Sequence, residues 1–265
     1  MTRFDELLRD VRACTACAAQ LPLAPRPVLQ AHPAARLLLA SQAPGRKVHE
    51  SGIPFDDASG ERLRTWLGIS RETFYDRRQV AIVPMAFCYP GTGASGDLPP
   101  PPECARRWRE RLLSQLTHIE LTVVIGSHAL AWHYGRFGPV RGLTITDAVR
   151  DWRRHWPSMI ALPHPSPRNN RWLVRNPWFE AELLPVLRAR VAEVLAGAAA
   201  DRKGTKDRKA RAAPVDRPAG SNGSNGTRTG REGETGNGGR NAGEGAGKRA
   251  GRKAAAARGD RRAAA

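Results

Sequence analysis

The sequence predicts an α/β protein, a three-layer α/β/α sandwich around a mostly parallel, four-stranded central sheet. Four short apolar runs have the length and content of buried strands, and they cover residues 36–40, 81–84, 121–125 and 159–162. Segments with helical spacing or helix-start signals lie between them. This alternation favours parallel pairing, because the chain must cross back over the sheet between neighbouring parallel strands.

Helix and strand signals alternate through the first half of the chain. Four apolar residues near the N-terminus recur at helical spacing: Phe4, Leu7, Leu8 and Val11. They predict a short helix that leads to Cys14. Residues 21–33 contain four prolines and are expected to form an extended surface segment before the first strand. After that strand, Ser59 can cap a helix that runs to about Leu67.

The second half repeats the pattern. Residues 89–102 are rich in glycine and proline and are expected to form a loop. The run 121–125 is the clearest buried parallel strand, because nearly all its residues are aliphatic or β-branched. The helices expected in this half cover residues 103–116, 127–134, about 147–156, and 177 to about 195.

Composition divides the chain into a folded domain and a tail. From Asp201 onward, Val215 is the only large apolar residue, and small or basic residues dominate. Such a segment cannot bury enough apolar surface to offset the entropy of ordering it. We therefore expect a folded domain at residues 1–197 and a disordered, basic Gly/Ala/Arg-rich tail at residues 198–265.

The chain carries a formal net charge of +18. Residues 201–265 contain 17 Lys and Arg against seven Asp and Glu, so +10 of that charge lies in the tail and +8 in the domain. A basic domain joined to a basic tail predicts a polyanionic partner, and DNA is the default choice. For the tail alone, an arginine-rich composition without DNA binding is the alternative.

No export or membrane segment is expected. Residues 1–12 are polar and lack the central apolar region of a signal peptide, and no apolar run reaches the length of a membrane span. We expect a monomeric, cytoplasmic protein that associates with the nucleoid and not with a membrane.

The four cysteines of the chain are candidate metal ligands: Cys14, Cys17, Cys88 and Cys104. In an intracellular protein, four cysteines that include a Cys-x-x-Cys pair indicate a metal more often than disulfides. Tetrahedral zinc and a 4Fe–4S cluster both accept four thiolates, so the spacing alone leaves both open. Four unrelated buried thiols are the remaining alternative.

Two polar loops follow predicted strands. The first covers residues 41–55, begins with Ser-Gln-Ala-Pro-Gly and ends with Gly-Ile-Pro-Phe. The second covers residues 164–170 and reads His-Pro-Ser-Pro-Arg-Asn-Asn. Loops at the carboxyl ends of parallel strands converge on one crevice, so these two could form a single site. A tight Pro-Gly turn, an aromatic face and a histidine suit the binding of a flat base flipped out of DNA.

These loops resemble the two motifs of the uracil-DNA glycosylase superfamily. The first motif is matched by Ala43, Pro44, Gly45, Gly52, Pro54, Phe55, Gly60 and Leu63. The segment His164-Pro165-Ser166 is similar to the histidine loop of that superfamily. The nearest branch is the iron–sulfur family 4, and the resemblance covers about residues 10–195. It implies the same α/β/α fold, DNA as the partner and a structural 4Fe–4S cluster on the four cysteines.

The resemblance also implies roles for individual residues. His164 would donate a hydrogen bond to the leaving base, and Phe55 would stack on that base. The backbone of the first loop would form a wall of the pocket, through Gln42, Ala43, Pro44 and Gly45. The second loop would contact phosphates or the DNA groove, through Ser166, Arg168, Asn169 and Asn170. The implied reaction is hydrolysis of the N-glycosidic bond of uracil or another deaminated base.

Three positions depart from the family 4 pattern. Gln42 stands where the family has a glutamate, and His49 stands where the family has a second acidic residue. Pro84 stands where the family has the asparagine that reads the Watson–Crick edge of uracil. Three nearby acidic residues could substitute for the missing carboxylate: Glu50, Asp56 and Asp57. Of these, Asp56 follows Phe55 directly and is expected to lie nearest the pocket, so we take it as the candidate catalytic acid. The other candidate catalytic residues are His164 and Gln42.

A DNA-base glycosylase is therefore the first functional hypothesis. The alternative is a damaged-DNA-binding protein of the same fold with weak activity or none, because Gln42 and Pro84 supply neither the family's carboxylate nor its base-reading amide. A different hydrolase or nucleotide-binding enzyme is disfavoured, since the sequence contains no P-loop, dinucleotide-binding glycine pattern or Ser-His-Asp pattern.

Overall fold

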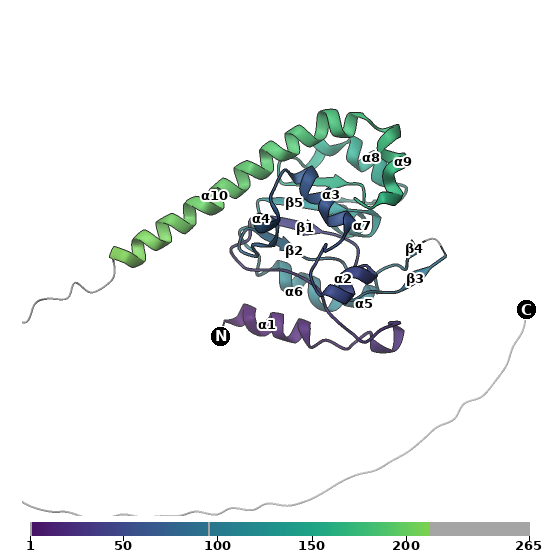
Figure 1. The fold of residues 1–265 in the computed structure, drawn as a ribbon, viewed down its shortest axis with the longest axis horizontal. Coiled ribbons are helices and arrows are strands. Elements are labelled where there is room, and N and C mark those ends of the chain that lie inside the picture. Colours follow the sequence, from purple (N-terminus) through teal and green to yellow (C-terminus); the bar gives the residue numbers. More distant parts are fainter. Residues whose placement is uncertain (1, 95, 212–265) are drawn as a thin grey trace, which may run out of the picture. The chain divides into compact units, whose positions relative to one another are not determined.

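The central sheet has four parallel strands. A computed structural model describes residues 2–94 and 96–211, with the backbone alone for residues 198–211. The strand order is β2-β1-β5-β6, and all three pairings are parallel. The strands are β1 (Leu37–Ala40), β2 (Val80–Ile82), β5 (Leu121–Ile125) and β6 (Met159–Leu162). The predicted α/β/α architecture with a four-stranded parallel sheet is confirmed (Figure 1).

Strand β1 lies near the middle of the sheet and fixes its register. Leu37 pairs with Val80 of β2 on one side and with Leu121 of β5 on the other. All four residues of β1 are buried, as are those of β2 and β6. Helices cover both faces of a parallel sheet, which is why these strands consist of continuous apolar runs in the sequence.

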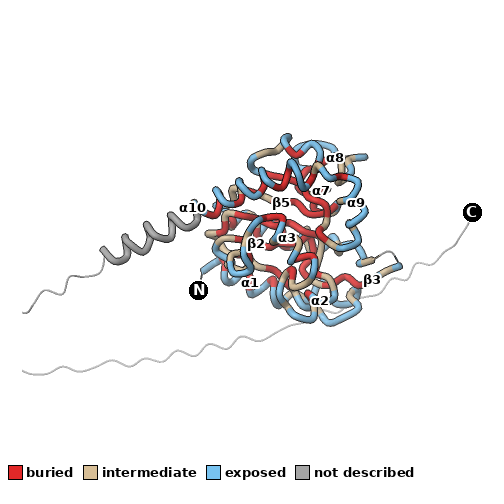
Figure 2. The backbone as a smooth tube through the Cα atoms, turned by 45° about the horizontal axis from the view of Figure 1, so that its top comes forward, coloured by how far each residue is buried: buried red, intermediate tan, exposed pale blue. Residues whose placement is uncertain are grey.

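Helices cover both faces of the sheet (Figure 1). On one face, α1 (Arg3–Arg12) and α6 (Glu110–Leu113) pack against Leu38 and Ala81. On the other face, α3 (Ala58–Leu67) and α10 (Leu184–Arg211) pack over Leu37 and Leu39. Figure 2 shows the buried strands at the centre of these layers.

Shorter elements complete the domain. The remaining helices are α2 (Arg46–Ser51), α4 (Arg71–Tyr75), α5 (Pro102–Cys104), α7 (Ser127–Tyr134), α8 (Ile145–Arg150) and α9 (Asn170–Arg175). Single turns of 3-10 helix lie at Ala18–Gln20, Gly135–Phe137, Trp152–His155 and Pro167–Asn169. Stretches of π-helix lie at Ala105–Arg109 and Phe179–Leu183. The first of these joins α5 to α6 as one continuous helical segment, as expected for 103–116.

Two of the differences from the expected elements near the site concern the start of α3 and the loop 89–102. Asp57, not Ser59, caps α3: its Oδ1 accepts a hydrogen bond of 2.9 Å from the Gly60 N–H. Aspartate and serine are equally good caps, and the extended backbone at Asp57 decides between them. The second difference is a two-stranded antiparallel hairpin within the expected loop 89–102, formed by β3 (Thr92–Gly93) and β4 (Gly96–Asp97).

The C-terminal helix is longer than expected. Instead of ending near Leu195, α10 continues to Arg211, into the stretch that was expected to belong to the tail. This stretch is rich in Ala, Lys and Arg, which are strong helix formers. Backbone contacts divide the chain into units 1–214 and 215–265. The rest of the predicted tail, residues 212–265, lies outside the described residues.

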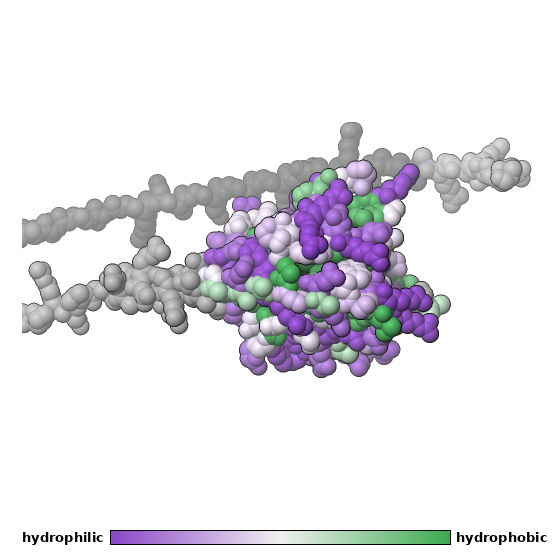
Figure 3. Space-filling view, turned by 90° about the horizontal axis from the view of Figure 1, so that it is seen from above, coloured by the Kyte–Doolittle hydropathy of each residue, from purple (hydrophilic) through white to green (hydrophobic). Residues whose placement is uncertain are grey.

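One face of the domain is mostly polar. Figure 3 shows one face on which hydrophilic side chains predominate, with small hydrophobic patches between them. Among the residues that the structure describes, none of the helices combines the length and apolar content needed to cross a membrane.

Candidate active site

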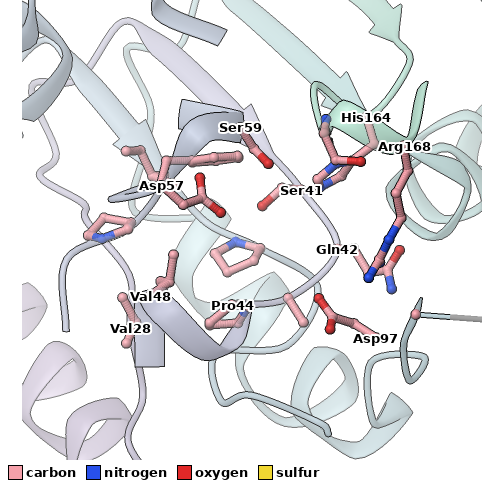
Figure 4. Close-up of a pocket in the computed structure, with 18 of the residues that line it drawn as sticks. Val28, Ser41, Gln42, Pro44, Val48, Asp57, Ser59, Asp97, His164 and Arg168 are labelled. Atoms are coloured by element: carbon pink, nitrogen blue, oxygen red, sulfur yellow. Dashed lines mark hydrogen bonds between the residues drawn. The ribbon is translucent and has the colours of Figure 1, made fainter. Parts of the chain in front are cut away.

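One cavity of about 540 Å³ opens where strands β1, β2 and β6 end. The predicted site residues that line it are Gln42, Ala43, Pro44, Gly45, Phe55, Pro84, His164, Ser166, Arg168 and Asn169. The two loops singled out in the sequence therefore form a single site, as predicted. Residues that were not predicted as site residues complete the lining, among them Ser41, Ser59 and Asp97 (Figure 4).

The turn after β1 is fastened to the segment after β2. The Met85 N–H donates to the Ser41 carbonyl over 2.8 Å, and the Ala86 N–H donates to the Gln42 carbonyl over 3.0 Å. These bonds extend the parallel pairing of β1 and β2 beyond the strands and bring Pro84 into the cavity wall. Proline offers no side-chain amide, so it cannot read a base edge as an asparagine would.

Phe55 forms an aromatic wall of the cavity and is held under backbone strain. Its φ is +57°, a left-handed conformation that is uncommon for a bulky residue. The Tyr75 hydroxyl donates to the Phe55 carbonyl over 3.3 Å, and Phe74 packs edge-on at 6.1 Å between ring centroids. A β-carbon placed on Gly60 would lie 1.8 Å from the Phe55 carbonyl oxygen, so only glycine fits there. Strain of this kind is maintained where the surroundings fix a side chain for function.

His164 is oriented by its own loop. The Ser166 N–H donates to His164 Nδ1 over 3.3 Å, and the Asn169 side-chain amide donates to the His164 carbonyl over 2.7 Å. The Arg62 guanidinium, from α3, donates to the Ser166 carbonyl over 3.1 Å and ties the loop to the domain. Because Nδ1 accepts a hydrogen bond, the proton of the neutral ring belongs on Nε2.

The electrostatic environment favours the neutral form of this ring. Burial lowers the pKa of His164 below its usual value, and Arg168 lowers it further. Asp57 and Asp97 act in the opposite direction and do not outweigh the burial. At neutral pH His164 is therefore a neutral imidazole with an Nε2–H available as a donor.

The candidate catalytic acid Asp56 does not line the cavity, so the expectation that it lies nearest the pocket is wrong. Its carboxylate pairs instead with the Arg71 guanidinium at 3.1 Å on the protein surface. Neighbouring side chains on extended backbone point to opposite sides, and Asp57 takes the inward position as the cap of α3. The cavity carboxylates are therefore Asp57 and Asp97.

Two other predicted residues also lie outside the lining. Glu50 pairs with Arg46 at 3.0 Å along α2, and Asn170 begins α9. Asp97 was missed because it belongs to a glycine-rich stretch, where a polar residue is ordinarily a solvated turn residue. Only the folding of the hairpin toward the first loop brings it to the cavity.

The four cysteines line a second, smaller cavity, together with apolar residues such as Leu21, Phe87 and Trp108. The Trp108 indole N–H donates to Cys14 Sγ over 3.2 Å. Burial raises the pKa of the Cys88 thiol to about 11 and that of Cys104 to about 12. A positively charged metal centre would offset the cost of the buried thiolates. Four thiols facing one apolar cavity are a donor set that fits such a centre.

Within the described ranges 2–94 and 96–211, however, no three or more His, Cys, Asp and Glu side chains are grouped so that they could hold a metal ion. Support for a metal centre at the cysteines therefore comes only from the presence of four thiols and from their position around one cavity.

The sequence comparison agrees with the geometry of the site. Residues 30–188, more than half of the chain, match the family model of the Uracil DNA glycosylase superfamily. The matched region contains the sheet, both loops and every residue that lines the cavity except Val28. The chain therefore belongs to the uracil DNA glycosylase superfamily.

Proposed function

We propose that this protein is a DNA glycosylase that hydrolyses the N-glycosidic bond of uracil or another deaminated base flipped out of DNA. The observation that carries the proposal is the convergence of Phe55, the turn 42–45 and the Nε2–H of His164 on one cavity. A cavity of about 540 Å³ is of the size that proteins use for small ligands such as a single nucleobase.

The chemistry of base removal matches these groups. When the bond from C1′ to the base breaks, the sugar gains positive charge and the base gains negative charge. The His164 Nε2–H is suited to stabilise an oxygen of the departing base, because a neutral donor in a buried site needs no reorganisation. Phe55 offers a face on which the flipped base can stack.

Pro84 in the cavity wall argues against reading uracil through a side-chain amide at that position. The substrate is therefore proposed as a class of deaminated bases, which includes uracil, hypoxanthine and xanthine. A catalytically weak or inactive damaged-DNA-binding protein is the second candidate. It is favoured by one observation: Gln42, which has no carboxylate, is the first-loop side chain that lines the cavity where the family has a glutamate (Figure 4).

An excision assay separates the two candidates. Single- and double-stranded oligonucleotides carrying one uracil, hypoxanthine or xanthine would be incubated with enzyme in excess and then treated with alkali. We expect strand cleavage at one or more of these bases and none in undamaged DNA. Binding of the damaged oligonucleotides without cleavage would instead establish the second candidate.

DNA is the proposed partner, and the charge of the chain supports it. The net charge is +18, and Arg168 stands at the cavity with its loop. Cationic surfaces and tails bind the phosphate backbone without reading sequence. A cytoplasmic, nucleoid-associated location would follow from this binding.

For the four cysteines we propose a structural 4Fe–4S cluster, with zinc as the alternative. Cys14 and Cys17 follow α1, Cys88 follows β2, and Cys104 ends α5. A shared centre would therefore fasten the N-terminal helix to segments that are distant in sequence. Its contribution would be to folding stability, because the cysteine cavity is separate from the cavity that holds His164.

A further inference from the structure

The β3–β4 hairpin supplies a carboxylate to the site from outside both family motifs. Asp97, on β4, lines the cavity, and its Oδ2 lies 3.6 Å from the point where a β-carbon on Gly45 would stand. The neighbouring Gly96 has a φ of +130° and packs so closely on Arg168 that a β-carbon there would come within 2.5 Å of Nη1. The hairpin is thus pressed against both loops of the site.

A chain of hydroxyl groups orients Asp97. The Thr92 hydroxyl donates to Asp97 Oδ1 over 3.3 Å. Because that hydroxyl has a single proton, the 2.5 Å contact between Thr92 Oγ1 and the Tyr89 hydroxyl must be donated by Tyr89. Tyr89 is buried and Asp97 is exposed, so the chain runs from the protein interior to a carboxylate at the surface of the cavity, and Oδ2 takes no part in it. This arrangement is typical of a positioned functional group.

The cavity has two ends, and Asp97 is at the end where the sugar would lie. Asp57 and Ser59 lie together at one end, two and four residues after Phe55, the aromatic wall for the base. Gln42, Arg168 and Asp97 lie together at the other end, with His164 above the space between (Figure 4). A base stacked on Phe55 would therefore direct its sugar and phosphate toward Gln42, Arg168 and Asp97.

We propose that Asp97 is the carboxylate that acts on the sugar side of the reaction, stabilising positive charge at C1′ and accepting a proton from the attacking water. This inference rests on the proposed glycosylase function. The water oxygen bonds to C1′ as the bond from C1′ to the base nitrogen breaks. The electron pair of that bond leaves with the base, whose oxygen accepts a hydrogen bond from His164 Nε2–H. The water proton passes to Asp97 and then to solvent.

Asp57 is the competing carboxylate, and its contacts assign it a different role. Its Oδ1 accepts the Gly60 N–H and caps α3. Its place beside Ser41 and Ser59 is at the base end of the cavity (Figure 4). The amide of Gln42 lies at the sugar end but cannot take up a proton from water. Asp97 is therefore the carboxylate in position for this step.

The first test is single-turnover excision by the full chain. Asp97→Asn keeps the shape of the side chain and removes its charge, and we expect a fall of about 100-fold in the excision rate constant. Thr92→Val removes the hydroxyl that donates to Asp97 and accepts from Tyr89 but keeps the carboxylate, so it should give a smaller fall. Asp56→Asn is the matched control, because its carboxylate lies outside the cavity, and its rate should equal that of the wild type. Equal rates for wild type and Asp97→Asn would overturn the proposal.

The second test does not require turnover. Duplexes would carry a cationic pyrrolidine abasic analogue, which mimics charge at the sugar, or a neutral tetrahydrofuran analogue. We expect the wild type to bind the cationic analogue about tenfold more tightly than the neutral one. Asp97→Asn should lose this preference and should bind the neutral analogue as tightly as the wild type or more so, because a negative charge facing phosphates is gone.

The two tests keep failure of the proposal distinct from failure of the proposed function. If the wild type excises no base but shows a cation preference that Asp97→Asn abolishes, glycosylase activity is refuted while the placement of Asp97 at the sugar stands. If the wild type has no cation preference, or if Asp57→Asn abolishes it and Asp97→Asn does not, the placement of Asp97 is wrong.

Discussion

At the scale of single residues, Gly60 determines whether Phe55 can line the cavity. A β-carbon at Gly60 would overlap the Phe55 carbonyl, at 1.8 Å, so Gly60→Ala must displace Phe55 or the first turn of α3. We expect a loss of about 1–3 kcal/mol in unfolding free energy, measured by urea denaturation, and weaker excision. Gly135→Ala is the control, since a β-carbon there would meet nothing within 4 Å, and it should leave stability unchanged. Equal stability of the two variants would show that Gly60 is not needed to hold Phe55 in place.

Arg109 and His133 form a buried pair. The guanidinium is 1% exposed and donates to the carbonyls of Val83 and Pro84, each over 3.0 Å. Its Nη2 also donates to His133 Nε2 over 2.6 Å, so that ring nitrogen must be unprotonated. Arg109 thus fixes the backbone that carries Pro84 into the cavity wall. Burial, with Arg109 as the next cause, lowers the pKa of His133 to about 2.

This pair predicts a pH dependence of stability. The pKa of His133 is lowered in the folded protein. Below pH 6.5, therefore, His133 is protonated in the unfolded chain but stays neutral in the folded protein. Stability therefore falls as the pH falls through 6.5. Between pH 7.5 and 5.5, urea denaturation should show the wild type losing roughly 1 kcal/mol more than His133→Gln, which cannot titrate. Identical losses for the two proteins would mean that His133 is protonated in the folded state.

At the scale of elements, the proposed metal centre links α1, the segment after β2 and the end of α5. Cys88→Ser or Cys104→Ser should lose iron, measured in protein prepared anaerobically, together with the broad visible absorbance of an iron–sulfur protein. The melting temperature should fall as well, because the three segments lose their common link. Thr15→Ala, between Cys14 and Cys17, keeps all four thiols and lies outside the lining of the cysteine cavity, so it should change neither property. If the wild type contains zinc and no iron, the centre is a zinc site and not a 4Fe–4S cluster. If it contains no metal, the proposed metal centre is refuted.

Elements that could be predicted from sequence are those specified by local pattern. The strands 37–40 and 121–125 are continuous apolar runs, and the structure places both as expected. The helices α2 and α4 have six and five residues, too few for a helical repeat to be visible in the sequence, and they were missed. The helical extension of α10 was missed because its composition was weighed for burial rather than for helix propensity.

In the candidate site, too, some features could be predicted from the sequence and others could not. The two loops lie at the ends of predicted strands, so their convergence follows from the topology of a parallel sheet. The choice between Asp56 and Asp57 depends on which side chain caps α3, and sequence alone does not specify it. Asp97 reaches the cavity only through the contacts of the hairpin with Gly45 and Arg168, which lie about 50 and 70 residues away in sequence.

At the scale of the whole molecule, the basic C-terminal segment is expected to add DNA affinity without specificity. Residues 212–265 contain 11 Lys and Arg against five Asp and Glu. Deleting them should leave the melting temperature and single-turnover excision unchanged. DNA binding at low salt should weaken, and the slope of log affinity against log salt should decrease by about 0.9 for each lost phosphate contact.

A matched control separates charge from length. A tail of the same length with glutamine in place of Lys and Arg should behave like the deletion. A lower melting temperature or a changed base preference in the deletion variant would show that this segment belongs to the structure or to the site.

The central claim is that His164 acts on the departing base in a glycosylase. The most direct measurement compares His164→Ala with the wild type in two quantities, the single-turnover excision rate constant and the dissociation constant for damaged DNA. Leaving-group stabilisation acts in the transition state, whereas affinity for DNA rests on many phosphate contacts. We predict a fall of at least about 100-fold in excision with a dissociation constant within about threefold of the wild type. An equal loss of excision and binding would contradict this account and assign His164 a structural role.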